Sequence, residues 1–210
     1  MTGVQTCALP IEYFTENVGD WKVDNYVEDT IIKKLGNTKK YIKIVKIPGR
    51  YQYVDFENKK VLVRVDFNVP LDDDGDITED ERIMAVIPTI TFLLEKNAKI
   101  ILMSHLGRPK GEIVEKLKMD KIAKKLSELL DREVMKLDDC IGQEVKEKIN
   151  EMKKKEIILL ENLRFHAEEE NNDEEFAKEL AGLADVYVND AFANCHRNHA
   201  SMTTITKFLP

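Results

Sequence analysis

Imidazole and guanidinium side chains gather in this sequence just after short apolar runs. All four histidines lie in such segments, and three of the segments also carry an arginine. Guanidinium forks match phosphate and carboxylate groups bidentately, so these segments could capture a small anion if the fold brings them together. The candidate residues are Asp66 and Asn68 after VLVRV, His105 and Arg108 after KIILM, Arg164 and His166 after EIILL, and His196, Arg197 and His199 after DVYVN.

The apolar runs have the length of strands, and stretches with helical spacing separate them. KIILM (99–103) and EIILL (156–160) are continuously apolar, which is typical of parallel strands covered on both faces. The alternation predicts an α/β fold, a doubly wound parallel sheet of about five strands in three α/β/α layers. The predicted strands are 60–67, 99–103, 133–137, 156–160 and 185–189, and the predicted helices are 82–95 with a kink at Pro88, 120–130, 141–152 and 173–183.

In a doubly wound sheet, ligands bind outside the carboxyl ends of the strands, where the candidate residues would meet. The chain carries 32 basic and 39 acidic residues for a net charge of −7, so a local positive patch would focus anions. This pattern predicts a site for a small, multiply charged phosphorylated acid. Asp66 and Asn68 would contact its hydroxyl or carboxylate end, and helix N-termini would add backbone donors.

Composition excludes several other classes of function. The net negative charge argues against nucleic-acid binding, and no apolar run approaches the ~18 residues of a membrane span. Neither GxGxxG nor GxxxxGK[ST] occurs, so no nucleotide site is assigned to this chain. Without a signal-peptide pattern, the expected location is the cytoplasm.

Metal and cysteine chemistry are not expected either. The three cysteines, Cys7, Cys140 and Cys195, are odd in number and widely spaced, which argues against a disulfide scaffold or a structural zinc site. The acidic run 72–76 lacks EF-hand spacing and predicts a solvated turn. His166 lies far from other ligands in the sequence, and the acids 168–170 are expected to cap the following helix.

The first 57 residues differ from the rest. Residues 1–11 carry no charge and resemble a translated sequencing adapter, so we exclude them from fold reasoning. Residues 12–57 form an unassigned extension in which YIKIVKI suggests a basic strand. The regular pattern begins at residue 58.

At the strand ends, residues 58–210 resemble the N-terminal, 3-phosphoglycerate-binding domain of phosphoglycerate kinase. The resemblance rests on long motifs in the family's order, and motifs of this length are highly specific. They are VLVRVDFNVP (61–70), ERIMAVIPTI (81–90), ILMSHLGRPKG (101–111), DDCIG (138–142), ILLENLRFHAEEE (158–170), and DVYVNDAF followed by HRNHAS (185–201).

The resemblance implies reversible phosphoryl transfer between 1,3-bisphosphoglycerate and ADP, giving 3-phosphoglycerate and ATP, in glycolysis. It implies that Arg82 reaches the transferring phosphoryl group, and that the family member is a monomer. The residues that it assigns to 3-phosphoglycerate are Asp66, Asn68, His105, Arg108, Arg164 and Arg197, together with Arg82.

The sequence departs from the family in two places. After DAF the family usually continues Gly-Thr-Ala-His-Arg-Ala-His, whereas this chain has Ala193, Asn194 and Cys195 before His196 and Arg197. Loss of the glycine would remove backbone freedom there. The chain also ends where the family continues into a second domain that binds ATP or ADP with Mg²⁺, so we expect a fragment without turnover.

Two other interpretations compete with the kinase fragment. A stand-alone module that binds a phosphorylated acid without catalysis would share the same site residues. A receiver-like signalling domain would need a phosphoacceptor Asp at the end of its third strand and a Lys at the end of its fifth. Here the run EVMKL continues to Asp138, and the fifth run ends at Asn189 and Asp190, which argues against that class.

Overall fold

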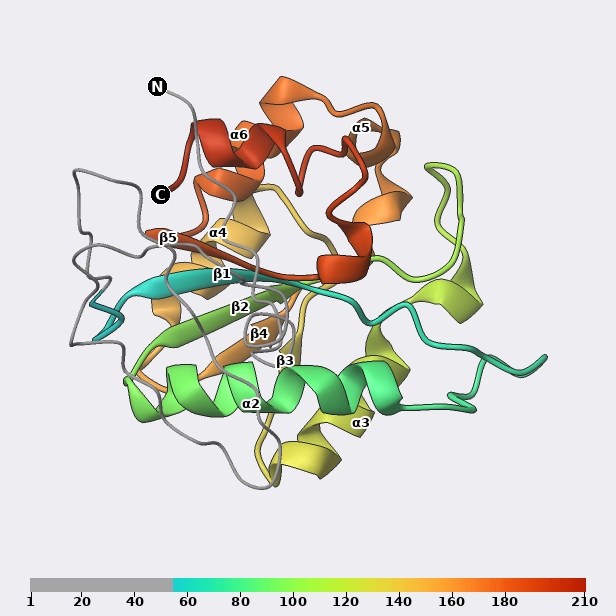
Figure 1. The fold of residues 1–210 in the computed structure, drawn as a ribbon, viewed down its shortest axis with the longest axis horizontal. Coiled ribbons are helices and arrows are strands. Elements are labelled where there is room, and N and C mark those ends of the chain that lie inside the picture. The colour runs from blue at the N-terminus through green and yellow to red at the C-terminus, as the bar shows by residue number, and fades with distance from the viewer. Residues whose placement is uncertain (1–54) are drawn as a thin grey trace, which may run out of the picture.

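A computed structural model describes residues 55–210, so the predictions for residues 1–54 lie outside the described part. Its centre is a sheet of five parallel strands in the order β3-β4-β2-β1-β5 (Figure 1). The strands are β1 (Lys60–Val65), β2 (Lys99–Met103), β3 (Met135–Lys136), β4 (Ile157–Leu159) and β5 (Val186–Asp190). The predicted doubly wound α/β fold is therefore confirmed.

Helices cover both faces of the sheet, α2 and α3 on one and α4, α5 and α6 on the other (Figure 1). Their bounds are α2 (Glu81–Glu95), α3 (Asp120–Leu130), α4 (Gln143–Glu151), α5 (Ala167–Glu170) and α6 (Glu174–Ala181). Short 3₁₀ turns add η1 (Glu115–Leu117), η2 (Leu163–Phe165), η3 (Phe192–Asn194) and η4 (Thr204–Lys207). No helix in the described part is long and apolar enough to cross a membrane.

Strand β1 shows how the continuous apolar runs serve two cores at once. Val61 and Val63 belong to the core under α2 and α3, whereas Leu62 belongs to the core under α4 and α6. Successive strand side chains point to opposite faces, so a strand with helices on both sides is apolar throughout. Arg64 breaks this rule, because it lies on the Leu62 side and is almost fully buried.

Strand β3 is shorter than the predicted 133–137, and at its N-terminal end the backbone bonds away from the sheet. It lies at the sheet edge and pairs only with β4. The Val134 amide donates to Ser127 Oγ at 3.1 Å instead of to a strand neighbour. Helix α2 runs through Pro88 as one helix, and the kink predicted there stays a prediction.

The predicted capping of α6 by residues 168–170 is wrong. Asp173 is the N-cap, and its carboxylate accepts from the Phe176 amide at 2.9 Å. Glu169 is instead completely buried in α5. The acidic run 72–76 is a turn, as predicted, in which Asp72 Oδ1 accepts from the amides of Asp74 and Asp76.

The central strand β2 should dominate the stability of this fold. Leu102 is fully buried, and truncation to alanine removes its core contacts and leaves a cavity. We expect Leu102→Ala to lower the free energy of unfolding by about 2 to 5 kcal/mol, measured by urea denaturation. Met84→Ala, at a side chain that is half exposed on α2, is the control and should cost under about 0.5 kcal/mol.

Candidate functional site

Four neighbouring strands of the sheet, β4, β2, β1 and β5, deliver the predicted site residues to one edge. Their carboxyl ends lie next to one another because the strands are parallel. Asn68 follows β1, and its Oδ1 accepts from the Gly107 amide, in the loop after β2, at 2.8 Å. Arg164 follows β4 and donates from Nη1 to the Gly107 carbonyl at 2.7 Å. The loops after β1, β2 and β4 thus meet at Gly107.

Asn162 connects the loops that follow β2 and β4. Its side chain is fully buried and makes four hydrogen bonds. Oδ1 accepts from the amides of Leu106 and Arg164, at 3.2 and 3.1 Å. Nδ2 donates to the carbonyls of Leu106 and Leu117, at 2.8 and 3.0 Å. Asn162 is not among the predicted site residues.

His105 lies in a positively charged and dry environment. It is 2% exposed, and its Nδ1 is 3.0 Å from Nη2 of Arg64. Since a guanidinium can only donate, Nδ1 accepts and the ring proton is left on Nε2. Burial is the largest cause, and with the charges of Arg64, Arg164, Arg197 and His199 it lowers the pKa of His105 to about 2. The imidazole is neutral and offers one N–H donor.

Arg164 and Arg197 carry buried donor atoms that make no hydrogen bond. Nη2 of Arg164 and Nε of Arg197 both lack an acceptor. Nε of Arg164 lies 3.1 Å from Glu170 Oε1, an ion-pair distance without hydrogen-bond geometry. Burial lowers the pKa of Arg164, against the attraction of the Glu170 carboxylate. Buried donors are nearly always paired in folded proteins, so these are the atoms that an anion would satisfy.

Asp66 and Arg82 form a second group at the same edge. An Arg82 Nη1 donates to Asp66 Oδ2, and the Arg82 side chain is half exposed. Arg82 lies in the first turn of α2. Arg108 is exposed next to Gly107 and has no ion pair with another described residue. We call these residues the basic cluster. It has a more buried part, His105, Arg164 and Arg197, and a more exposed rim, Arg82 and Arg108.

A buried chain of polar groups that sequence reasoning missed supports the cluster. Arg64 donates from Nε to Ser201 Oγ at 3.0 Å and from Nη1 to the Val65 carbonyl. Ser201 donates from Oγ to Glu169 Oε1 at 2.6 Å and from its amide to Oε2 at 2.9 Å. A charged residue inside an apolar run was the available signal for Arg64, whereas nothing local marked Glu169.

Two further expectations about this segment change. His166 does not join the basic cluster, since its Nε2 is 2.7 Å from Asp139 Oδ1 and its ring packs against Phe176. Ala193 lies in η3 and does not adopt a positive φ, so the loss of a glycine there removes no freedom that the backbone uses. Arg197 follows, half buried.

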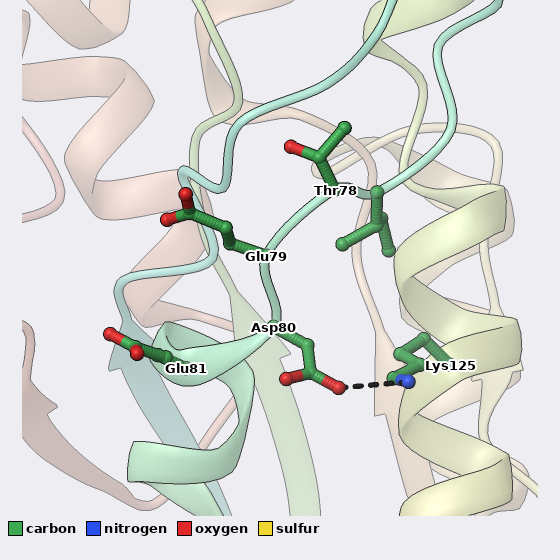
Figure 2. A pocket seen from close by; sticks show the side chains of 6 residues that line it. Thr78, Glu79, Asp80, Glu81 and Lys125 are labelled. Carbon is green, nitrogen blue, oxygen red and sulfur yellow. Dashed lines mark ion pairs between the residues drawn. The ribbon is translucent and has the colours of Figure 1, made fainter.

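A depression beside this edge carries the wrong charge for the same ligand. It lies at the N-terminus of α2, and its one cation, Lys125, is 2.8 Å from Asp80 (Figure 2). Carboxylates at this place would repel a phosphorylated acid, so the depression does not suit that ligand. The lining residues are Ile77, Thr78, Glu79, Asp80, Glu81 and Lys125.

The sequence matches the family model described as phosphoglycerate kinase over residues 51–210. It is 58% identical over 155 residues to phosphoglycerate kinase of Gloeothece citriformis and 58% over 156 residues to that of Dictyoglomus turgidum. Each match covers 74% of this chain and 39% of the relative, so the chain spans about two fifths of the length of these relatives.

Solved structures give the same result. The fold is similar to phosphoglycerate kinase from Coxiella burnetii, with a TM-score of 0.66 and 35% identity, over 74% of this chain and 38% of that one. The enzyme from Pyrococcus horikoshii gives a TM-score of 0.69 and 40% identity, over 75% and 40% of the two chains. At these identities the similarity reaches beyond the fold.

Neutral His105 makes the stability depend on pH in a defined window. Its pKa is lowered from 6.5 to about 2, so below pH 6.5 the unfolded chain takes up a proton that the folded chain does not. The free energy of unfolding should therefore fall as the pH falls from 6.5, by up to about 1.4 kcal/mol per pH unit from this group.

The test compares urea unfolding of the chain at pH values above and below this threshold. His105→Gln should remove that part of the slope, whereas His196→Gln, at an exposed histidine, should keep it. An unchanged slope in His105→Gln would show that His105 is protonated in the folded protein.

Proposed function

The chain belongs to the phosphoglycerate kinase family, and from this premise we propose that residues 55–210 hold 3-phosphoglycerate during the family's reaction. The reaction is reversible phosphoryl transfer between 1,3-bisphosphoglycerate and ADP, giving 3-phosphoglycerate and ATP. The observation that carries the proposal is the pair of buried guanidinium atoms without acceptors, Arg164 Nη2 and Arg197 Nε. A phosphate or carboxylate between them would supply the missing acceptors.

In the proposed complex, charge decides which end of the substrate lies where. The phosphate carries most of the negative charge and lies against Arg164, Arg197 and Arg108, with the His105 Nε2–H as a neutral donor. Asn68 keeps the Gly107 loop in place, and Asp66 contacts the substrate hydroxyl. Neutral His105 adds a donor without adding charge that the free site would have to carry.

Arg82 is proposed to stabilise the transferring phosphoryl group. Its guanidinium pairs with Asp66 but is half exposed, so it can exchange that partner for a phosphoryl oxygen as charge develops. The substrate carboxylate oxygen is the nucleophile when ATP is the donor, so the protein needs no nucleophile of its own. Positioning and charge neutralisation then supply the catalysis.

The residues of this chain do not fit the nucleotide. Neither phosphate-binding glycine motif occurs in its 210 residues, and we assign the positive cluster of the described residues to the phosphorylated acid. We propose that ATP or ADP with Mg²⁺ binds to the part of the family's length that this chain does not span. A cytoplasmic, monomeric enzyme stays a prediction.

Arg164 should be the residue on which substrate binding depends most. We expect saturable amide shifts on NMR titration of the chain with 3-phosphoglycerate, near residues 66, 105 and 164. Arg164→Ala should weaken binding at least about tenfold, because a charge-assisted hydrogen bond is worth about 1.5 to 3 kcal/mol. Arg164→Lys, which keeps the charge but loses the fork, should fall in between.

Arg132→Ala is the matched control, since it removes an exposed arginine just after α3. The dispersion of the amide peaks reports separately whether each variant folds. A well-dispersed Arg164→Ala spectrum that still shifts with unchanged affinity would refute the site.

Turnover is expected to be absent from the 210-residue chain by itself. Supplied with 1,3-bisphosphoglycerate, ADP and Mg²⁺, it should form ATP no faster than buffer, while the full-length Dictyoglomus turgidum relative serves as the positive control. ATP formation by the purified chain would place a nucleotide site within it. Substrate binding without turnover is also what a stand-alone binding module would show, and extending the reading frame separates the two.

A further inference from the structure

A cluster of three metal-ligating side chains lies apart from the proposed substrate residues. Asp139 and Cys140 follow strand β3, and His166 follows the 3₁₀ turn η2. One ligand atom from each lies within 4.8 Å of both others, and His166 Nε2 is 2.7 Å from Asp139 Oδ1. Within residues 55–210 this is the one such group of three. In the sequence His166 lies 26 positions after Cys140, and the parallel pairing of β3 and β4 brings them together.

The donor set selects a class of cation. A sulfur, an imidazole nitrogen and one carboxylate oxygen suit zinc, whereas calcium and magnesium prefer oxygen ligands alone. With zinc about 2.3 Å from sulfur and about 2.0 to 2.2 Å from nitrogen and oxygen, tetrahedral ligands lie roughly 3.3 to 3.7 Å apart. The cluster therefore needs shifts on the order of 1 Å, within the reach of side-chain torsions.

The surroundings hold two of the ligands in place and leave a path for the ion. The Cys140 amide donates to Asp139 Oδ1 at 2.6 Å, and the His166 ring packs on Phe176 with ring centres 5.3 Å apart. Cys140 is fully buried, while the side chains of Asp139 and His166 are 52% and 26% exposed. A cation could enter from the solvent side and meet the sulfur last.

The Cys140 thiol must lose its proton to bind a cation, because the thiolate is the form that ligates metals. A bound cation would replace the proton, which leaves for solvent, and would turn the Asp139 carboxylate from a repelling neighbour into a second ligand.

We propose that Asp139, Cys140 and His166 form a binding site for zinc, with three protein ligands and a fourth position open to water. None of the three is among the residues assigned to 3-phosphoglycerate. His166 is two residues after Arg164, so a bound zinc would tie the loop after β3 to the segment that carries this arginine. The bound ion would act as a removable cross-link between the loops that follow β3 and β4.

The experiment uses the whole chain, freed of metal with a chelator and titrated with Zn²⁺ or Co²⁺. Native mass spectrometry should show one zinc per chain. Co²⁺ should produce visible bands of a tetrahedral ion and a near-ultraviolet thiolate-to-cobalt charge-transfer band. His166→Gln and Asp139→Asn should each weaken binding about a hundredfold or more, since even outer residues of metal sites are worth 10–100-fold.

Cys140→Ser should abolish the charge-transfer band, and the exposed ligands provide the test if this buried variant does not fold. Cys7→Ser, Cys195→Ser and His196→Gln are the matched controls and should bind as the parent does. Absence of a one-to-one zinc complex would overturn the proposal, as would a thiolate band that survives in a folded Cys140→Ser chain. So would affinity unchanged in both His166→Gln and Asp139→Asn.

Discussion

The guanidinium of Arg64 is buried within strand β1, and the site is arranged around the need to satisfy it. Removing an ion from water costs several kcal/mol even after relaxation, so its donors must find partners inside the protein. They find the Val65 carbonyl, Ser201 and His105, and Ser201 links Arg64 to the buried Glu169 carboxylate. The end of β2, helix α5 and the segment before η4 are thereby fixed around one strand.

The carboxylates near the cluster neutralise its guanidinium charges only in part, and this leaves the cluster positively charged. Glu169 is shared through Ser201, and Glu170 approaches Arg164 without a proper hydrogen bond. Several cations thus face few carboxylates on a chain whose net charge is −7. Positive potential confined to one sheet edge attracts a small anion there, while the rest of the acidic surface repels it.

Periodicity and the rule for parallel sheets predicted the strands, the layers and the edge where the candidate residues gather. They also selected Arg164, Asn68 and His105 as candidates, because these residues lie in the segments after apolar runs. They could not predict Arg64, since strand-end reasoning does not inspect the interior of a run. Glu169 was misassigned, because three consecutive acids suggest a cap and only the packing of Ser201 shows which of them is buried. The Asp139, Cys140 and His166 cluster depends on strand order, which spacing alone does not give.

The four hydrogen bonds of Asn162 have a consequence for how tightly a ligand can be held. The Asn162 side chain bonds the carbonyls of Leu106 and Leu117 and the amide of Arg164. It thereby joins three loop segments. Ordering a loop on binding would subtract conformational entropy from the affinity. Here that entropy is lost when the chain folds, so the site is preorganised. A ligand would need to order only the side chains at the rim, Arg108 and Arg82 among them.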